Sequence, residues 1–197
     1  MRIVTLSGGL RSPSSSRTLA DELTAATLRA LEQSGEEAEA EVVELRDHAH
    51  AIVDTMLTGF PTGEFADVVE RVTDADALIV VTPTFSAGMA GLVKSFFDVI
   101  EQDSLRGMPV LLAATGGTER HSLVIDHALR PLFAYFGAEP IPTGVYAATS
   151  DFGGEGTARL GQRIERAAQQ LVERVRGTTR RDRGEEFVEF EQLLRSR

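Results

Sequence analysis

Hydroxyl-bearing and cationic side chains gather in one stretch near the start of the chain, residues 7–18. Ser14, Ser16 and Thr18 offer hydroxyl and amide donors, and Arg11 adds a guanidinium. An amphipathic segment follows directly, so these groups lie where the positive end of a helix would bind a phosphate. The stretch has neither a Walker A pattern nor a G-x-G-x-x-G fingerprint. It predicts a phosphate-binding loop of another type, with a serine-rich helix cap as the alternative.

A second candidate loop follows the continuously apolar run of residues 77–82. It contains Pro83, Thr84, Phe85 and Ser86. Its residues are mostly small, which leaves backbone amides accessible for hydrogen bonds to a planar ring. On its own, this loop is a weak indication of a ligand.

A third candidate loop follows another apolar run, residues 109–114. Gly116 and Gly117 allow a ligand to approach the backbone closely. The hydroxyl of Thr115 can donate a hydrogen bond to a carbonyl or a ring nitrogen, and His121 lies at the end of the loop. The alternative is a tight turn that caps the next helix.

Strand-like and helix-like segments alternate along the chain. Short apolar or β-branched runs predict strands at residues 2–6, 41–45, 77–82, 109–114 and 141–147. Apolar stripes at helical spacing predict helices around residues 19–30, 65–72, 88–100, 121–136 and 160–175. Residues 46–63 give mixed signals, and we expect a loop with helical turns there.

This alternation predicts an α/β fold: a five-stranded parallel sheet in the flavodoxin-like order 2-1-3-4-5, with helices on both faces. Ligands of such sheets bind beyond the carboxyl ends of the strands, where all three loops would lie. We assign the domain to residues 1–177 and a partly flexible tail to residues 178–197. The apolar residues 187–194 of the tail are expected to dock either on the domain itself or on a partner subunit.

Composition excludes several classes of function. The 197-residue chain has no cysteine, so disulfides, thiolate metal sites and cysteine nucleophiles are impossible. The formal charge of −10 argues against a nucleic-acid partner. No apolar run is long enough for a membrane helix and no signal-peptide pattern is present, so we expect a cytoplasmic protein. His121 and His127 lack the i, i+4 spacing of a helical metal pair, and we expect no metal site.

Taken together, the three loops resemble the NAD(P)H-dependent FMN reductases of flavodoxin-like fold, over residues 1–148. The resemblance is strongest to reductases that supply reduced FMN to two-component monooxygenases of the alkanesulfonate or luciferase-like type. The matching motifs are Leu10-Arg11 with Pro13-Ser14 and Ser16, residues 77–80 with Thr82-Pro83 and Phe85, and residues 114–118 with His121, Asp126 and residues 128–131.

The resemblance implies a role for each matching residue. Arg11, Ser14 and Ser16 would hold the FMN phosphate, with Thr18 beside them. The residues implied to border the isoalloxazine and ribityl chain are Pro83, Thr84, Phe85 and Ser86. Thr115, Gly116 and Gly117 would contact the polar edge of the ring, with His121 nearby. Many relatives have asparagine where this chain has Ser86.

The resemblance also implies hydride transfer from NADPH or NADH to FMN, in a homodimer or homotetramer. This chemistry belongs to the cofactors, so no catalytic acid, base or nucleophile is expected. The chain has no Trp and two Tyr, Tyr135 and Tyr146, both outside the three loops. An uncovered ring favours exchange of flavin with a partner monooxygenase. The alternatives are a flavodoxin-like electron carrier and a quinone, azo-dye or metal-ion reductase.

Pro131 falls inside the helix expected at residues 121–136. Because proline has no N–H and its ring crowds the carbonyl four residues earlier, the helix must kink, widen into a π-type turn or receive a contact from another chain. The related reductases have a π-type bulge here, near a subunit interface. The resemblance therefore implies that His127 lies at such an interface; a kinked surface helix with a solvated histidine is the alternative.

Overall fold

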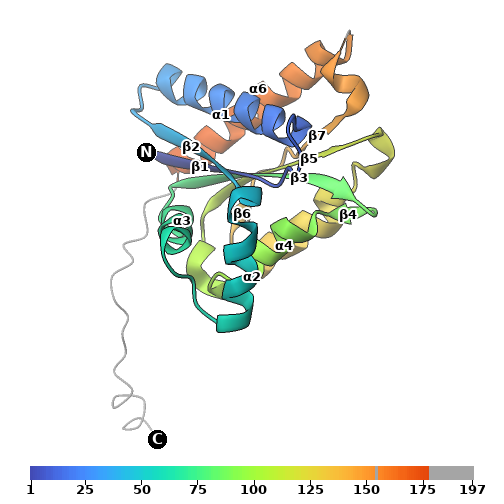
Figure 1. Ribbon diagram of the computed structural model, residues 1–197. Coiled ribbons are helices and arrows are strands. Elements are labelled where there is room, and N and C mark those ends of the chain that lie inside the picture. The colour runs from blue at the N-terminus through green and yellow to red at the C-terminus, as the bar shows by residue number, and fades with distance from the viewer. Residues whose placement is uncertain (154, 178–197) are drawn as a thin grey trace, which may run out of the picture.

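The computed structural model describes residues 1–153 and 155–177. Within them one sheet lies between two layers of helices (Figure 1). The tail assigned to residues 178–197 lies outside the described residues. No helix in the described part combines the length and the apolar character needed to cross a membrane.

The sheet confirms the predicted strand order. Its strands are β1 (Arg2–Ser7), β2 (Glu39–Glu44), β3 (Ala77–Phe85), β4 (Gly88–Met89), β5 (Pro109–Gly116), β6 (Glu139–Pro140) and β7 (Val145–Ala148). The parallel order is β2-β1-β3-β5, and both β6 and β7 pair with the far edge of β5. The two short strands together take the fifth position, which gives the doubly wound order expected from the sequence.

Helices cover both faces of the sheet (Figure 1). The helices are α1 (Ser15–Gln33), α2 (Ala49–Thr58), α3 (Glu64–Thr73), α4 (Gly91–Asp98), α5 (Arg130–Tyr135) and α6 (Glu155–Gly177). Short 3-10 turns are η1 (Leu45–His48), η2 (Gln102–Leu105), η3 (Glu119–His121) and η5 (Thr149–Phe152). Helices α1 and α6 pack on one face, and α2 to α5 pack on the other.

The central strand β3 shows how the two layers share the sheet. Ile79 and Val81 pack under α1 and α6, whereas Leu78 and Val80 face the other layer. This alternation follows from the two-residue period of a strand. Because both faces are covered, β3 and β5 are apolar almost throughout, as expected for buried parallel strands.

The fifth strand predicted at residues 141–147 is interrupted. Pairing with β5 ends at Pro140 and resumes at Val145. Pro142 has no N–H to donate, and the pairing with β5 stops here. The carbonyls of the unpaired residues therefore need partners other than β5. The Arg130 guanidinium supplies them, donating to the Ile141 carbonyl at 3.1 Å and to the Pro142 carbonyl at 2.6 Å.

Two other expectations need correction. Residues 46–63, expected as a loop with helical turns, contain the ten-residue helix α2. The buried side of α2 is small, with Ile52 and Thr55, while Val53, Met56 and Leu57 face solvent. This outward-facing stripe made the amphipathic pattern hard to recognise. The helix predicted from residue 88 begins instead at Gly91, because Gly88–Met89 pairs back onto β3.

Of the three outcomes expected near Pro131, the structure shows the widened π-type turn. Residues Ile125–Leu129 form a π-helix, η4, and α5 begins directly after it. Pro131 occupies the first turn of α5, where a missing N–H costs least. The helix predicted from residue 121 therefore begins only at Ile125, as the π-helix, and continues as α5, with Pro131 at a tolerated position.

Candidate functional site

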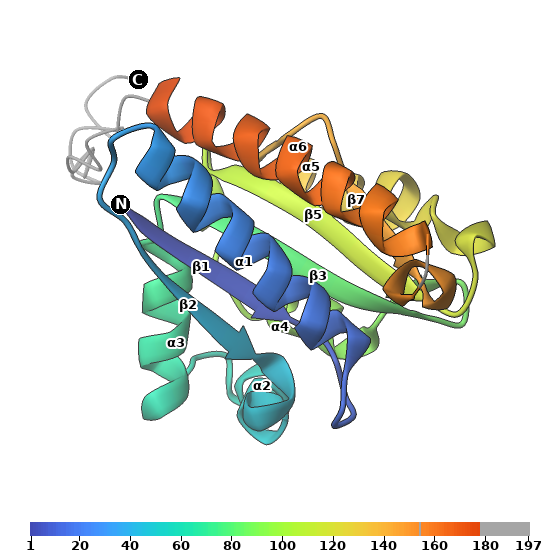
Figure 2. The ribbon, with the colours of Figure 1, turned by 90° about the horizontal axis from the view of Figure 1, so that it is seen from above.

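The three candidate loops meet at the carboxyl edge of the sheet. In Figure 2, β1, β3 and β5 run side by side beneath α1 and α6. The register pairs Ser7 with Val81 and Pro83 with Thr115, so all three strands end at nearly the same level. The loops that follow them therefore form one surface, as the sequence predicts.

The first loop approaches its neighbours too closely for side chains. The Gly8 amide donates to the Val81 carbonyl at 2.8 Å. A Cβ on Gly8 would lie 2.3 Å from Val93, and one on Gly9 would lie 2.0 Å from the Ser14 hydroxyl. A larger residue at either position would therefore displace a neighbouring side chain, and at Gly9 that side chain is the Ser14 cap of α1.

Ser14 is the N-cap of α1, and its hydroxyl accepts from the Arg17 amide at 3.3 Å. Of the amides in the first turn, this leaves those of Ser15 and Ser16 without an acceptor inside the helix. The Ser7 hydroxyl, at the end of β1, is buried and has no hydrogen-bond partner among the described residues. Amide and hydroxyl donors without acceptors are suited to an anion.

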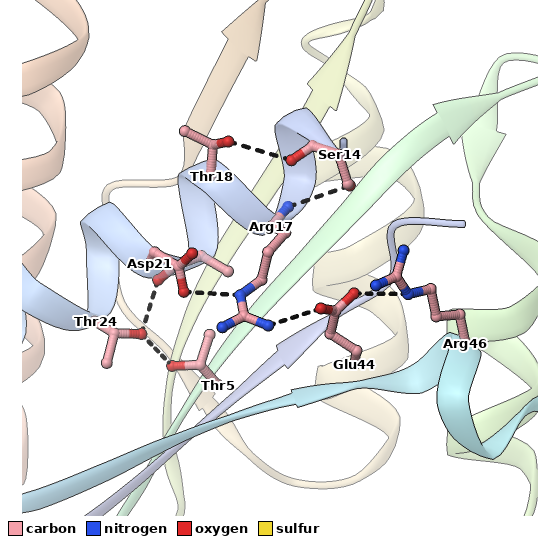
Figure 3. A network of polar contacts seen from close by, with 9 residues as sticks. Thr5, Ser14, Arg17, Thr18, Asp21, Thr24, Glu44 and Arg46 are labelled. Atoms are coloured by element: carbon pink, nitrogen blue, oxygen red, sulfur yellow. Dashed lines mark hydrogen bonds and ion pairs between the residues drawn. The ribbon is translucent and has the colours of Figure 1, made fainter. Parts of the chain in front are cut away.

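Glu44 organises the charges beside this loop (Figure 3). One carboxylate oxygen of Glu44 accepts from Arg17 at 2.7 Å, and the other lies 2.9 Å from Arg46. Arg17 also donates to Asp21 at 2.8 Å, and this hydrogen bond is the largest cause of the raised pKa of the Arg17 guanidinium. The Arg17 guanidinium is therefore already paired with two carboxylates of the protein.

Arg11 differs from its two arginine neighbours. Its carbonyl accepts from the Arg46 guanidinium at 3.0 Å, which fixes the loop backbone. Its own guanidinium is exposed and has no ion-pair partner in the described part of the chain. Arg11 is consequently the cation of this loop that remains available to an anionic ligand.

The second loop is a β-hairpin whose turn is strained. Strand β3 pairs with β4 through Thr84 and Phe85, so Ser86 and Ala87 are the two turn residues. Their φ angles of +48° and +65° lie in the left-handed region, which favours glycine. The Thr84 hydroxyl at this hairpin is buried without a hydrogen bond of normal geometry, and Phe85 is 47% exposed.

The third loop is joined to the first by a buried hydrogen bond. The hydroxyls of Ser16 and Thr115 lie 2.7 Å apart, and both residues are 2% exposed. The side chain of Ser16 is thereby used inside the protein, and its amide remains available to a ligand. The Thr18 hydroxyl bonds to the Ser14 carbonyl at 3.3 Å, so it too serves the helix.

The remaining predicted residues lie at the rim of this surface. Ser86 and Gly117 are exposed at the tips of their loops. His121 is exposed at the end of η3, where its amide lies 3.5 Å from the Thr118 carbonyl.

Sequence reasoning missed three residues that support the loops. Glu44 ends β2 and Arg46 follows it, at a strand end on this edge outside the three candidate loops. Tyr146, placed outside the loops, donates its phenol hydrogen to the Thr118 carbonyl at 2.7 Å. Its position in a strand that ends at this same edge was the available signal.

Comparison with known proteins decides the family. The family model described as NADPH-dependent FMN reductase matches residues 1–153. The chain belongs to this family. A curated FMN reductase (NADPH) from Pseudomonas aeruginosa is 44% identical over 151 residues, which cover 77% of this chain and 78% of the relative. The family resemblance is thus confirmed, and with it an oxidoreductase that uses FMN and a nicotinamide nucleotide.

Two further similar proteins cover more of the chain. The NADH-dependent FMN reductase SfnE of Pseudomonas putida is 39% identical over 187 residues, covering 87% of this chain and 91% of the relative. A solved oxidoreductase structure from Corynebacterium diphtheriae is 40% identical, with a TM-score of 0.87 over 90% of this chain and 98% of that one. The similarity therefore extends through the whole fold described above.

The residues of the three loops fit the chemistry of FMN. The first loop offers amides, the orphan hydroxyl of Ser7 and the unpaired guanidinium of Arg11, which suit a phosphate. The second and third loops expose backbone groups beside Gly116 that can hydrogen-bond to the ring. The buried Thr84 hydroxyl lies close to Gly116. Glu44, a carboxylate beside the first loop, already pairs with Arg17 and Arg46.

The strained hairpin generates a prediction about stability. We expect Ala87→Gly to raise the free energy of unfolding by about 0.5–1 kcal/mol, because relief of a left-handed φ, about 1–2 kcal/mol, exceeds the entropic cost of a glycine. Ala25→Gly, at an exposed position inside α1, is the control and should lower it by about 0.5–1 kcal/mol. Urea unfolding of both variants measures the difference. A loss of stability in Ala87→Gly would contradict the inferred strain.

Proposed function

We propose that this chain reduces free FMN with a nicotinamide nucleotide and supplies the reduced flavin to a flavin-dependent monooxygenase. The observation that supports the proposal is the edge built by the three loops. It combines the donors of the first loop, here called the phosphate cradle (the amides of Ser15 and Ser16 and the guanidinium of Arg11), with exposed backbone in the second and third loops. Hydride transfer from nicotinamide to flavin is the chemistry that the two cofactors supply. The protein provides binding, orientation and access.

We assign the phosphate to the first loop. The amides of Ser15 and Ser16 at the start of α1 and the guanidinium of Arg11 would donate to its oxygens. Ser14 contributes through its position as the cap that leaves those amides available. Riboflavin lacks the phosphate, so these groups would add affinity for FMN alone.

Arg11→Ala tests this assignment. We expect the dissociation constant for FMN to rise about tenfold to hundredfold, because a charge-assisted hydrogen bond contributes about 1.5–3 kcal/mol. The dissociation constant for riboflavin should change little. Arg29→Ala is the control, since Arg29 pairs with Glu165 on the outer surface of α1. Equal losses for both flavins, measured by quenching of flavin fluorescence, would contradict a phosphate site here.

We assign the isoalloxazine to the second and third loops. Pro83, Thr84, Phe85 and Ser86 would border the ring and ribityl chain, and Thr115, Gly116 and Gly117 would lie at the polar edge. These loops contain no Trp or Tyr, and Phe85 is their one Phe. No large aromatic pair is therefore available to enclose the ring, which supports entry of nicotinamide and exchange of flavin.

Steady-state kinetics separate this function from its rivals. We expect NADPH or NADH oxidation to rise with added free FMN and to saturate, because FMN turns over as a substrate. An electron carrier with tightly bound FMN would oxidise the nicotinamide nucleotide at a rate independent of added FMN. A quinone, azo-dye or metal-ion reductase would instead need its own acceptor for rapid turnover. If neither NADPH nor NADH is oxidised when free FMN is supplied, the proposed function is refuted.

We further propose a homodimer or homotetramer in which His127 contacts a neighbouring subunit. His127 and Leu123 are four residues apart at the π-helix, and Leu123 is 58% exposed. Elsewhere on the surface, Val53, Met56 and Leu57 of α2 and Phe60 just after it are each at least half exposed. Exposed apolar stripes of this kind are typical of protein interfaces, and a second copy of this chain is the simplest partner.

His127→Ala tests the interface. We expect the variant to shift toward a smaller assembly in size-exclusion chromatography with light scattering, and to reduce FMN more slowly. Arg29→Ala, on the outer surface of α1 where Arg29 pairs with Glu165, serves as the comparison. A His127→Ala protein that keeps both its assembly size and its turnover would contradict the assignment.

A further inference from the structure

Tyr146 contacts the third loop from below. It lies in β7 with 9% of its surface exposed, and its neighbour across the ladder is Ala114 of β5. From this position its hydroxyl reaches beyond the end of β5 and donates to the Thr118 carbonyl at 2.7 Å. The Thr118 hydroxyl in turn accepts from the Arg120 amide at 3.4 Å and caps η3.

The Tyr146 hydroxyl occupies the space that a side chain at position 116 would need. A Cβ on Gly116 would lie 2.1 Å from the Tyr146 Oη and 3.2 Å from its Cζ. The Thr84 Oγ1 is 3.5 Å from the same point, so the second and third loops meet at this phenol. Gly116 is therefore required for Tyr146 to reach Thr118.

Tyr146 remains a hydrogen-bond donor at neutral pH. Burial raises the pKa of its phenol above the ordinary value, and this effect outweighs the opposing influence of the Thr84 hydroxyl. A phenol has a single hydrogen to donate, and here the Thr118 carbonyl receives it. The backbone of Gly116–Thr118 is thereby fixed from the side opposite to solvent.

We propose that Tyr146 is a positioning residue that holds the Gly116–Thr118 backbone in the conformation that receives the polar edge of the flavin ring. This inference rests on the proposed flavin site. The phenol acts through the loop and does not touch the phosphate cradle. Its contribution should therefore be shared by every flavin that has the same ring, whether or not it carries a phosphate.

Tyr146→Phe removes the hydroxyl and keeps the ring. We expect the dissociation constants for FMN and riboflavin to rise by the same factor, about two- to tenfold, as expected for one neutral hydrogen bond. The visible absorption spectrum of bound flavin should shift, because the polar edge of the ring meets a less ordered backbone. Tyr135→Phe is the matched control: Tyr135 is 62% exposed and its hydroxyl donates to Gln102.

The outcomes distinguish this inference from the proposed function, because flavin binding is measured without turnover. Unchanged affinities and spectrum in Tyr146→Phe would overturn the inference, and so would a loss confined to FMN. Failure of the wild-type protein to oxidise NAD(P)H would instead refute the reductase function.

A second variant keeps the test decisive if Tyr146→Phe folds poorly. Gly116→Ala, introduced alone, should weaken the binding of both FMN and riboflavin, because its methyl group displaces the Tyr146 hydroxyl. Adding Tyr146→Phe to Gly116→Ala should cost little more, since the same contact is already lost. Fully additive losses in the double variant, or undiminished binding of both flavins by Gly116→Ala, would overturn the inference.

Discussion

The buried hydrogen bond between Ser16 and Thr115 joins the two halves of the candidate site across 99 residues of sequence. Ser16 belongs to the first turn of α1, and Thr115 lies near the end of β5. Because both hydroxyls are excluded from water, breaking their contact would leave two unsatisfied groups. This bond therefore fixes the amides at the start of α1 relative to the loop that follows β5. A ligand that spans both regions depends on that fixed separation.

Sequence periodicity predicted the sheet well because buried parallel strands leave a strong signal. The runs at 77–82 and 109–114 are apolar on both faces, and both became central strands. It failed where an element has little to bury or changes type within a few residues. Helix α2 has an apolar stripe directed outward, and Gly88–Met89 pairs as a strand only because the preceding turn adopts left-handed φ angles. Neither feature is visible in hydrophobic spacing alone.

For the candidate site, the sequence identified the loops better than the function of each side chain. Backbone position follows from strand ends, so the meeting of three loops could be foreseen. The partners of Ser16, Thr18 and Arg17 could not be foreseen, because each of these side chains bonds to another group of the protein. Tyr146 was overlooked for the opposite reason: its ring lies in a strand, while its hydroxyl acts on a loop about thirty residues earlier.

The charge arrangement explains how a chain of net charge −10 can present an anion site. Surface charges farther away than about 8 Å are largely screened at physiological ionic strength, so only nearby groups matter. Close to the first loop, Glu44 is neutralised by Arg17 and Arg46, and Asp21 by Arg17. The exposed guanidinium of Arg11, which has no ion pair among the described residues, and the positive end of α1 are the cationic groups available to a ligand here. Glu44 therefore contributes to the anion site, because it holds Arg46 where the Arg46 guanidinium can fix the Arg11 backbone without pairing with the Arg11 side chain.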